Sequence, residues 1–147
     1  MSKIIIHGGF FSESSTNIET KIAKQQALLR IVKDSYAYLQ NHSALETVVH
    51  AVSQLEDDEL FNAGIGSQIQ SDGKIRMSAS LMDGESQKMS GVINIEEVKN
   101  PIQVAQVLMQ VDDRILGGSG ATNFARKHGF ESFSTEIPQR RAEYEAK

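Results

Sequence analysis

The stretch LFNAGIGSQIQSDGKIRMSASLMDG, residues 60–84, decides how this chain folds. Its glycines lie among apolar residues, a pattern that is typical of neither a flexible linker nor a phosphate-binding loop. IGSQIQS and KIRMSASLM alternate between apolar and polar residues, which predicts two strands. SDGK between them predicts a hairpin turn whose glycine can take a positive φ. We therefore expect paired strands here, with a glycine-rich loop beside them.

One strand and two helices are predicted upstream of this stretch. KIIIHGGFF begins with β-branched residues, so we expect a buried strand that ends at its glycines. Apolar residues recur at helical spacing over residues 18–40 and again after residue 43, which predicts two amphipathic helices. Thr16-x-x-Glu19 and Ser43-x-x-Glu46 are capping boxes that mark the helix starts. The apolar face of the first helix would hold Ile18, Ile22, Leu29, Val32, Tyr36 and Leu39.

Downstream of the stretch, the pattern predicts a third strand in SGVINIEEV and a helix that begins at Asn100 and Pro101. RILGGSG predicts a short strand that runs into a turn, and ATNFARKHG predicts a short helix closed by Gly129. The polar tail, residues 131–147, is poorly patterned, and we expect a flexible end or linker. This order of elements predicts an α+β fold in which helices cover a mixed or antiparallel sheet.

The composition excludes several classes of protein. The 147 residues are the length of one domain, and the net charge of −4 argues against general nucleic-acid binding. The chain has no cysteine, so disulfides, thiolate metal sites and a cysteine nucleophile are excluded. No apolar run is long enough to span a membrane, and the start lacks the apolar core of a signal peptide. We therefore expect a cytoplasmic protein.

Three places could carry chemistry, and each also has a structural interpretation. His7-Gly8-Gly9 ends the first strand, where a histidine can be a base or a ligand, although more often it only donates or accepts structural hydrogen bonds. The glycines of residues 117–120 could hold a phosphate at a helix start, but a tight strand-to-helix turn is the stronger interpretation. Asn62, beside Gly64, is either an orienting group or oxyanion donor, or a turn residue.

Side-chain metal ligation is poorly supported, because the histidines are scattered and the run Glu56-Asp57-Asp58-Glu59 is typical of a solvated helix end. A cation held by backbone carbonyls in the glycine-rich loop stays open.

Five motifs in order resemble a known family: IIIHGG, LEDDELFNAGIGS, SASLMDG, VKNPIQVAQVLM and ILGGSGATNFARKHGF. Together they resemble the α-chain of plant-type L-asparaginases, or isoaspartyl peptidases, which are N-terminal-threonine hydrolases. The resemblance implies a four-layer αββα sandwich of the N-terminal nucleophile hydrolase type, of which this chain supplies about half. Residues 1–130 would form that half, and residues 131–147 would be the linker before the cleavage site.

The resemblance also implies an activity and its partners. A precursor would cut itself, and the threonine that opens the separate β-chain would be the nucleophile, with its own α-amino group as the base. The substrates would be the side-chain amide of asparagine and β-aspartyl (isoaspartyl) dipeptides. We expect the β-chain from the same precursor as partner, a dimer of αβ units, no nucleic acid and no membrane, and no cofactor for the chemistry.

Some residues take roles from the resemblance. Asn62 matches the family's asparagine that reaches the active site and helps to fix the surroundings of the nucleophile. The loop that follows the second helix resembles a structural sodium-binding loop whose ligands are mainly backbone carbonyls. These carbonyls would belong to Leu55, Glu56, Asp58, Phe61, Ala63 and Ile65.

The sequence also departs from the family pattern. Phe10-Phe11 stands where a small residue and a third glycine are usual, and Ser78 stands where an aspartate is frequent. A divergent homologue without activity, acting as a binding protein, is therefore one alternative. A small nucleotide-binding domain that uses residues 117–120 is a more distant one.

Overall fold

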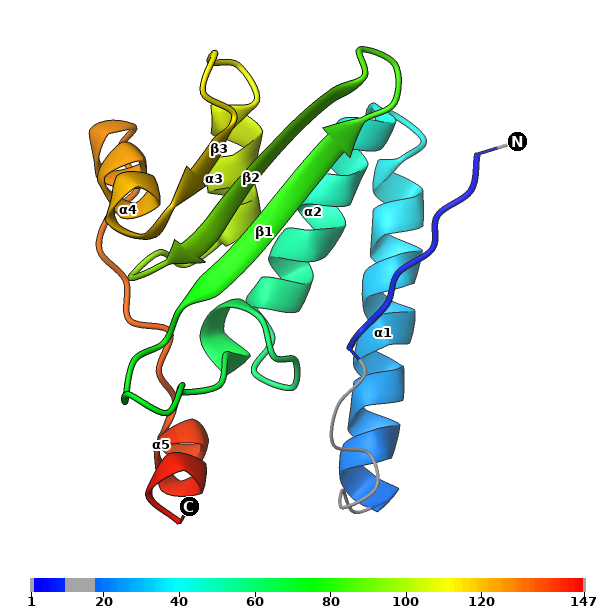
Figure 1. The fold of residues 1–147 in the computed structure, drawn as a ribbon. Coiled ribbons are helices and arrows are strands. Elements are labelled where there is room, and N and C mark those ends of the chain that lie inside the picture. Colours follow the sequence, from blue (N-terminus) through cyan, green and yellow to red (C-terminus); the bar gives the residue numbers. More distant parts are fainter. Residues whose placement is uncertain (1, 10–17, 147) are drawn as a thin grey trace.

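The structure, a computed structural model, describes residues 2–9 and 18–146 as a sheet with helices on one side (Figure 1). In chain order, the helices are α1 (Ile18–Tyr38), α2 (Ala44–Glu56), α3 (Pro101–Leu108), α4 (Gly118–Lys127) and α5 (Pro138–Glu145). A 3₁₀ helix, η1, spans Gly64–Gly66. The strands are β1 (Met77–Asp83), β2 (Lys88–Ile95) and β3 (Ile115–Gly117).

The sheet has the order β1-β2-β3 and is mixed, because β1 pairs antiparallel with β2 and β2 pairs parallel with β3. α3 packs on β1 and β2, and α4 packs on β2. Figure 1 shows these helices behind the sheet, while its front face is bare. The predicted mixed sheet covered by helices is therefore confirmed. A second sheet, as in a four-layer sandwich, stays a prediction.

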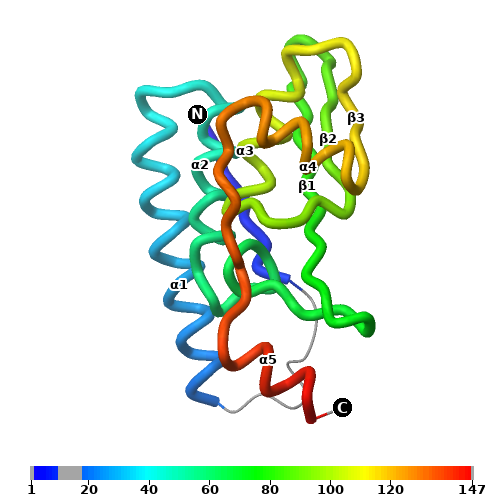
Figure 2. The backbone as a smooth tube through the Cα atoms, turned by 90° about the vertical axis from the view of Figure 1, so that its left-hand side faces the viewer, coloured from blue at the N-terminus to red at the C-terminus, as the bar shows by residue number. Residues whose placement is uncertain are grey.

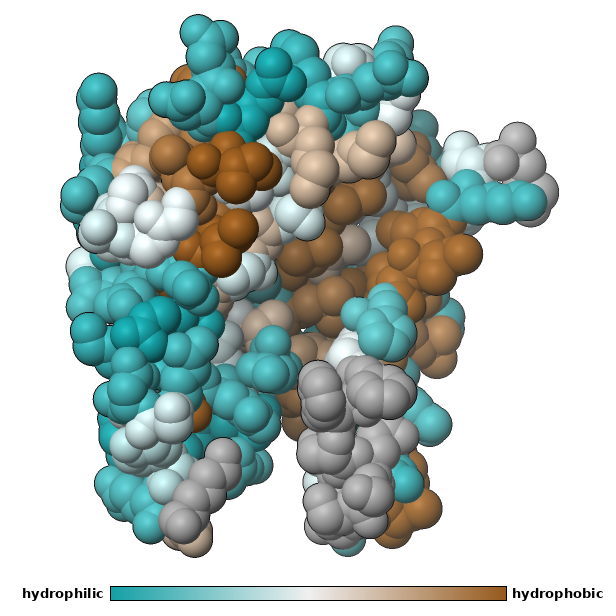
Figure 3. Space-filling model, in the orientation of Figure 1, coloured by the Kyte–Doolittle hydropathy of each residue, from teal (hydrophilic) through white to brown (hydrophobic). Residues whose placement is uncertain are grey.

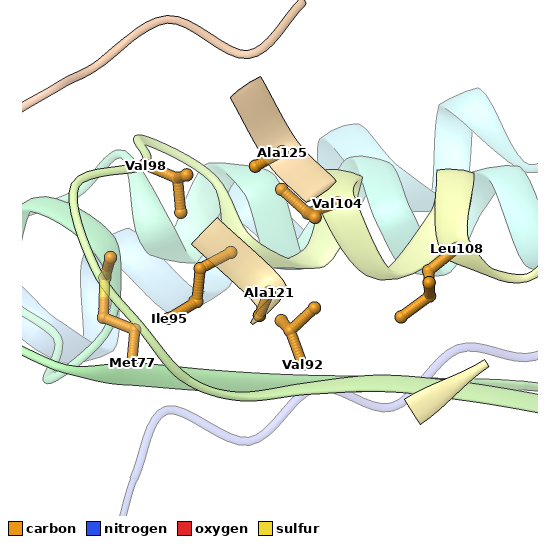
Figure 4. Packing of buried hydrophobic residues seen from close by; sticks show 8 residues of the cluster. All are labelled: Met77, Val92, Ile95, Val98, Val104, Leu108, Ala121 and Ala125. Atoms are coloured by element: carbon orange, nitrogen blue, oxygen red, sulfur yellow. The ribbon is translucent and has the colours of Figure 1, made fainter. Parts of the chain in front are cut away.

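The main core lies between the sheet and the two helices α3 and α4 (Figure 4). β2 contributes Val92 and Ile95, which are fully buried. Ala121 and Ala125 form the inner side of α4, and their small side chains allow that helix to lie close to β2. The remaining members of the cluster are Met77, Val98, Val104 and Leu108.

β2 does not alternate regularly. Val92 and Ile95 are both buried, whereas Ile93 between them is 51% exposed. The cause is an irregularity at Asn94, which takes a φ of +54°, and the pairing with β1 shifts register at the same level. This extra residue turns Ile95 into the core.

The helix pair α1 and α2 forms beside the sheet. The capping box at Ser43 is confirmed, since its Oγ accepts from the N–H of Glu46 and the Glu46 carboxylate accepts from the N–H of Ser43. The predicted apolar face of α1 is wrong, because Ala27, Ile31 and Ser35 are the buried residues. Ile31 fills this face between the two small side chains of Ala27 and Ser35, whereas Ile18, Ile22 and Leu29 are exposed.

Two strand predictions differ from the structure. The segment IIIHGG has no partner strand among the described residues and lies as an extended, unpaired segment over residues 2–9. IGSQIQS begins in η1 and continues without pairing, and the hairpin joins β1 to β2 instead. The SDGK turn is still present, because the Gln70 N–H donates to the Lys74 carbonyl at 2.8 Å and Gly73 takes a φ of +81°.

The tail is more ordered than predicted. Residues 138–145 form α5, which begins with Pro138 at its first turn. Figure 2 shows the segment after α4 running along the molecule to reach α5 at the opposite end. Thr16 of the first capping box and the pair Phe10-Phe11 lie outside the described residues. In the part of the chain that the structure describes, no helix has the length and apolar character needed to cross a membrane.

Truncation of Val104 tests the core. Val104 is 0% exposed and Val48 on α2 is 45% exposed, so the same substitution should have different costs at the two positions. We expect Val104→Ala to lower the free energy of unfolding by about 2 kcal/mol, from lost burial and the cavity left behind. Val48→Ala should change it by less than about 0.5 kcal/mol. Urea denaturation of each variant measures both values, and equal costs would contradict this packing.

Candidate functional site

A cavity lies where the N-terminal segment, α1, the loop after α2 and α5 meet. It has a volume of about 530 Å³. Its polar lining comes from residues far apart in the sequence: His7, Lys21, Lys24, Gln25, Asn62, Gln68 and Arg140. The cavity therefore brings together His7 and Asn62, two of the residues that the sequence singled out.

Asn62 is held in one orientation. Its Oδ1 accepts a hydrogen bond of 2.9 Å from the backbone N–H of Gln68. Among the described residues its Nδ2 makes no hydrogen bond, so this group is left as a donor beside the cavity. A fixed amide donor suits the binding of a carbonyl or an oxyanion, which was the functional interpretation of this residue.

The His7-Gly8-Gly9 segment lines the same cavity. His7 is exposed, and its Nδ1 accepts from the N–H of Gly9 at 3.4 Å, a local hydrogen bond. Gly8 is needed for close packing, since a Cβ there would lie 2.8 Å from Phe61 Cε1 and 2.9 Å from Leu28 Cδ2. The glycine thus lets the segment lie against α1 and the loop.

The loop after α2 folds back on itself tightly. Gly64 takes a φ of +51°, and a Cβ at this position would lie 2.0 Å from the carbonyl oxygen of Glu56. Gly66 is equally constrained, since its Cβ would lie 2.0 Å from the carbonyl oxygen of Phe61. Only glycine fits at these two positions, which explains why the stretch of residues 60–84 needs glycines beside apolar residues.

Several carbonyls expected to bind sodium also accept hydrogen bonds within this loop. The Asp58 N–H donates to the Leu55 carbonyl at 3.4 Å, and the Phe61 N–H donates to the Asp58 carbonyl at 3.1 Å. The Ala63 carbonyl accepts from Gly66 at 3.1 Å. A carbonyl oxygen has a second lone pair, so these bonds leave the groups able to bind a cation. Oxygen ligands of this kind are those that hard cations prefer, and the sodium site stays a prediction.

The side chain of Glu56 does not face the loop. It is 3% exposed, and its Oε1 accepts from the N–H of Ile102 at 3.1 Å, in the first turn of α3. Its Oε2 is buried without a hydrogen-bond partner among the described residues. Burial raises the pKa of the Glu56 carboxyl to about 8, and outweighs the hydrogen bonds from Ile102 and Asn100 that favour the ionised form. Glu56 therefore ties the loop to the helix layer.

Asp57 and Asp58, which follow Glu56, also join elements of the fold through their side chains. Asp58 accepts from Arg30 Nη2 on α1 at 2.9 Å and from the N–H of Leu60 at 3.1 Å. Asp57 accepts from Asn100 Nδ2 at 3.0 Å. Asn100 thus precedes α3 as predicted, although its side chain bonds to the loop region and not to its own helix. No group of three or more His, Asp or Glu side chains among the described residues could hold a metal ion.

Two further residues have structural roles. Gly118 takes a φ of +52° at the start of α4, so residues 117–120 form the expected strand-to-helix turn. Ser78 accepts through Oγ from the N–H of Asn94 at 3.1 Å, which supports the irregularity in β2.

Sequence reasoning missed Arg140. Its Nε donates to the carbonyl of Gly66 at 2.9 Å, and its side chain is only 14% exposed. The contact joins α5 to η1 across 74 residues of sequence, and no local pattern could have indicated it. Gln68 was missed for the same reason, since it acts through its backbone N–H.

Comparison with known proteins adds the decisive observation. The family model described as "Asparaginase" matches residues 1–146. The chain belongs to the asparaginase family. It is 49% identical to an isoaspartyl peptidase/L-asparaginase of Synechocystis sp., over 85% of this chain and 38% of that protein. It is 39% identical to the plant-type L-asparaginase of Pyrococcus furiosus, over 99% of this chain and 47% of that protein. This asparaginase-family chain therefore spans less than half the length of these curated relatives.

The glycine at position 64 gives a stability test. Gly64→Ala places a methyl group against the Glu56 carbonyl at a positive φ, so we expect a loss of more than about 2 kcal/mol in the free energy of unfolding. Gly84→Ala is the control, because nothing lies within 4 Å of its Cβ. Chemical denaturation compares the two variants. Tolerance of alanine at position 64 would refute the tight loop.

The buried carboxyl of Glu56 gives a pH test. Its pKa of about 8 in the folded chain exceeds the ordinary value of 4.5, so the folded chain keeps a proton that the unfolded chain releases. This stability is fully present below about pH 4.5 and is lost as the pH rises towards 8. Glu56→Gln removes the titration, so it should gain stability relative to wild type as the pH increases over this range. The exposed Glu59→Gln variant is the control, and parallel curves for wild type and Glu56→Gln would contradict the assignment.

Proposed function

We propose that this chain is the α-subunit part of an amidohydrolase that cleaves the side-chain amide of asparagine, β-aspartyl (isoaspartyl) dipeptides, or both. Membership of the asparaginase family carries the proposal, since relatives in it are named isoaspartyl peptidase/L-asparaginase. The cavity around Asn62 supports it, because a fixed amide donor beside a cavity of this size suits a small amide substrate.

The nucleophile would come from a separate β-chain. Among the described residues that line the cavity, none carries a hydroxyl or a thiol. Hydrolysis through an acyl-enzyme therefore needs a nucleophile from another segment, and the greater length of the relatives gives room for it. We assign that role to a threonine at the β-chain start, whose Oγ attacks the substrate carbonyl while its α-amino group takes the proton. The amide C–N bond then breaks, and ammonia or the amine of the dipeptide leaves with the proton held by the α-amino group. Water hydrolyses the resulting ester and releases aspartate.

Asn62 would act on this reaction from the α-chain. Its Nδ2 is a donor beside the cavity, and its Oδ1 is already fixed by Gln68. Such a donor can orient the threonine or hold the substrate carbonyl as negative charge develops on its oxygen.

A sodium ion held by the loop would serve structure and not chemistry. The carbonyls of Leu55, Glu56, Asp58, Phe61, Ala63 and Ile65 are the proposed ligands. Their support is the tight wrapping at Gly64 and Gly66, which gathers carbonyls without side chains in the way. A bound cation would fix the position of Asn62, because this residue lies within the same loop.

The bare face of the sheet supports the four-layer arrangement. Figure 3 shows apolar side chains gathered on this face. Met82, Met89, Ile93 and Ile115 are 66%, 52%, 51% and 52% exposed. An apolar sheet face of this kind needs a covering layer. We propose that the β-chain supplies a second sheet and that αβ units pair into a dimer.

Asn62→Ala in the complete protein tests the function. We expect kcat/KM for asparagine or an isoaspartyl dipeptide to fall about 10²-fold, the cost of losing one donor to a developing oxyanion. Asn123→Ala on the exposed side of α4 is the matched control and should leave kcat/KM unchanged. Unchanged kinetics in Asn62→Ala would remove its role. A wild-type protein that hydrolyses neither substrate would favour the non-catalytic homologue.

A further inference from the structure

α1 has two unlike sides. Ala27, Ile31 and Ser35 are buried on the side that packs against α2. The nearly opposite side carries large apolar residues that nothing covers among the described residues. Ile18 is 71% exposed, Leu29 is 53% exposed and Tyr36 is 41% exposed.

These exposed residues follow a heptad pattern. Starting from Ile18, steps of four and three alternate along the helix and slightly beyond its end, and six of the seven positions are apolar or aromatic. All of them are exposed or half-buried. We call this set the α1 seam: Ile18, Ile22, Gln25, Leu29, Val32, Tyr36 and Leu39. A strict heptad stripe is the pattern that packs against a second helix at a small crossing angle.

We propose that the α1 seam pairs with the α1 seam of a second copy of this chain, in antiparallel orientation about a two-fold axis. Antiparallel alignment centred near Ala27 places Ile18 against Tyr36 of the second copy and Ile22 against its Val32. Gln25, which also lines the cavity, then lies against Leu29, so six of the seven seam residues are paired and Leu39 lies beyond the paired stretch. A two-fold axis repeats every such layer, so the surface is complementary to itself.

Charge complementarity favours this occupant. Glu19 and Lys33 lie on the same flank of the seam, fourteen residues apart. In the alignment above, Glu19 of one copy lies beside Lys33 of the other, and the two-fold axis forms this pair twice. Gln26, on the same flank, lies opposite itself at the axis. The seam therefore favours its own antiparallel copy over a parallel one, in which Glu19 would lie fourteen residues from Lys33 of the other copy.

The helix that presents the seam is already fixed. Arg30 bonds to Asp58 at 2.9 Å, and Asp34 bonds to His50 at 2.7 Å, so α1 is tied to the loop and to α2. Pairing therefore does not have to order the helix first, which lowers the cost of association. The inference deepens the proposed dimer by naming its surface, and it is independent of the hydrolytic activity.

The first test is the oligomeric state of the complete protein, measured by light scattering during size-exclusion chromatography. Leu29→Lys puts a charge into the middle of the seam and should convert the dimer to a monomer. Val48→Lys is the matched control, because Val48 is equally apolar, 45% exposed and outside the seam. A dimer that survives Leu29→Lys would overturn the seam alone. A monomeric wild type would overturn the proposed dimer and the seam together, while leaving the hydrolase assay unaffected.

The second test examines whether the two α1 helices pair in antiparallel orientation. Glu19→Lys should weaken the dimer, and the double variant Glu19→Lys with Lys33→Glu should restore it, since the charges are exchanged across the axis. This chain has no cysteine of its own, so a cross-link between two copies of it has to join the introduced cysteines. Gln26→Cys should be cross-linked between copies by a short bismaleimide, whereas Gln40→Cys on the same flank should not. Equal cross-linking at both positions, or no rescue by the double variant, would overturn the antiparallel alignment.

Discussion

The close approach of Gly64 to the carbonyl of Glu56 is the constraint on which the rest of the site depends. It closes the loop after α2, and the buried carboxyl of Glu56 then fixes that closed loop to the first turn of α3. α3 packs on both long strands, so the position of Asn62 is set by the sheet through one glycine and one carboxyl. Burying the Glu56 carboxyl is costly, because its second oxygen has no hydrogen-bond partner in the described part of the chain. Its role in fixing the loop to α3 explains why the cost is tolerated.

Local patterns in the sequence predicted the parts of the fold that depend on neighbouring residues. The capping box at Ser43, the Pro101 helix start and the closing Gly129, with its φ of +84°, all lie where short-range chemistry places them. The hairpin prediction failed because pairing depends on which segments meet, and the SDGK turn does not by itself bring strands together. The buried face of α1 was missed because two of its three buried residues, Ala27 and Ser35, are small, so that large apolar residues do not mark this face.

The candidate site was only partly predictable, because the sequence shows local motifs but not contacts between distant segments. Asn62 and the glycines form a local motif, so the sequence indicated them directly. Arg140 reaches Gly66 from α5, and Gln68 acts through its backbone, so neither leaves a pattern in the sequence. The bare sheet face and the α1 seam are both exposed apolar surfaces, and both belong to a chain that spans less than half the length of its relatives. We assign the first to the β-chain and the second to another copy.

Denaturing intact mass, combined with N-terminal sequencing of the purified complete protein, tests the central claim most directly. The account predicts two polypeptides in equal amounts, of which the second begins with threonine, because we propose that the β-chain supplies the hydroxyl that the described lining of the cavity lacks. A single uncut polypeptide would contradict it. The family relationship would then describe ancestry of the fold, and the cavity would have to be explained as a binding site.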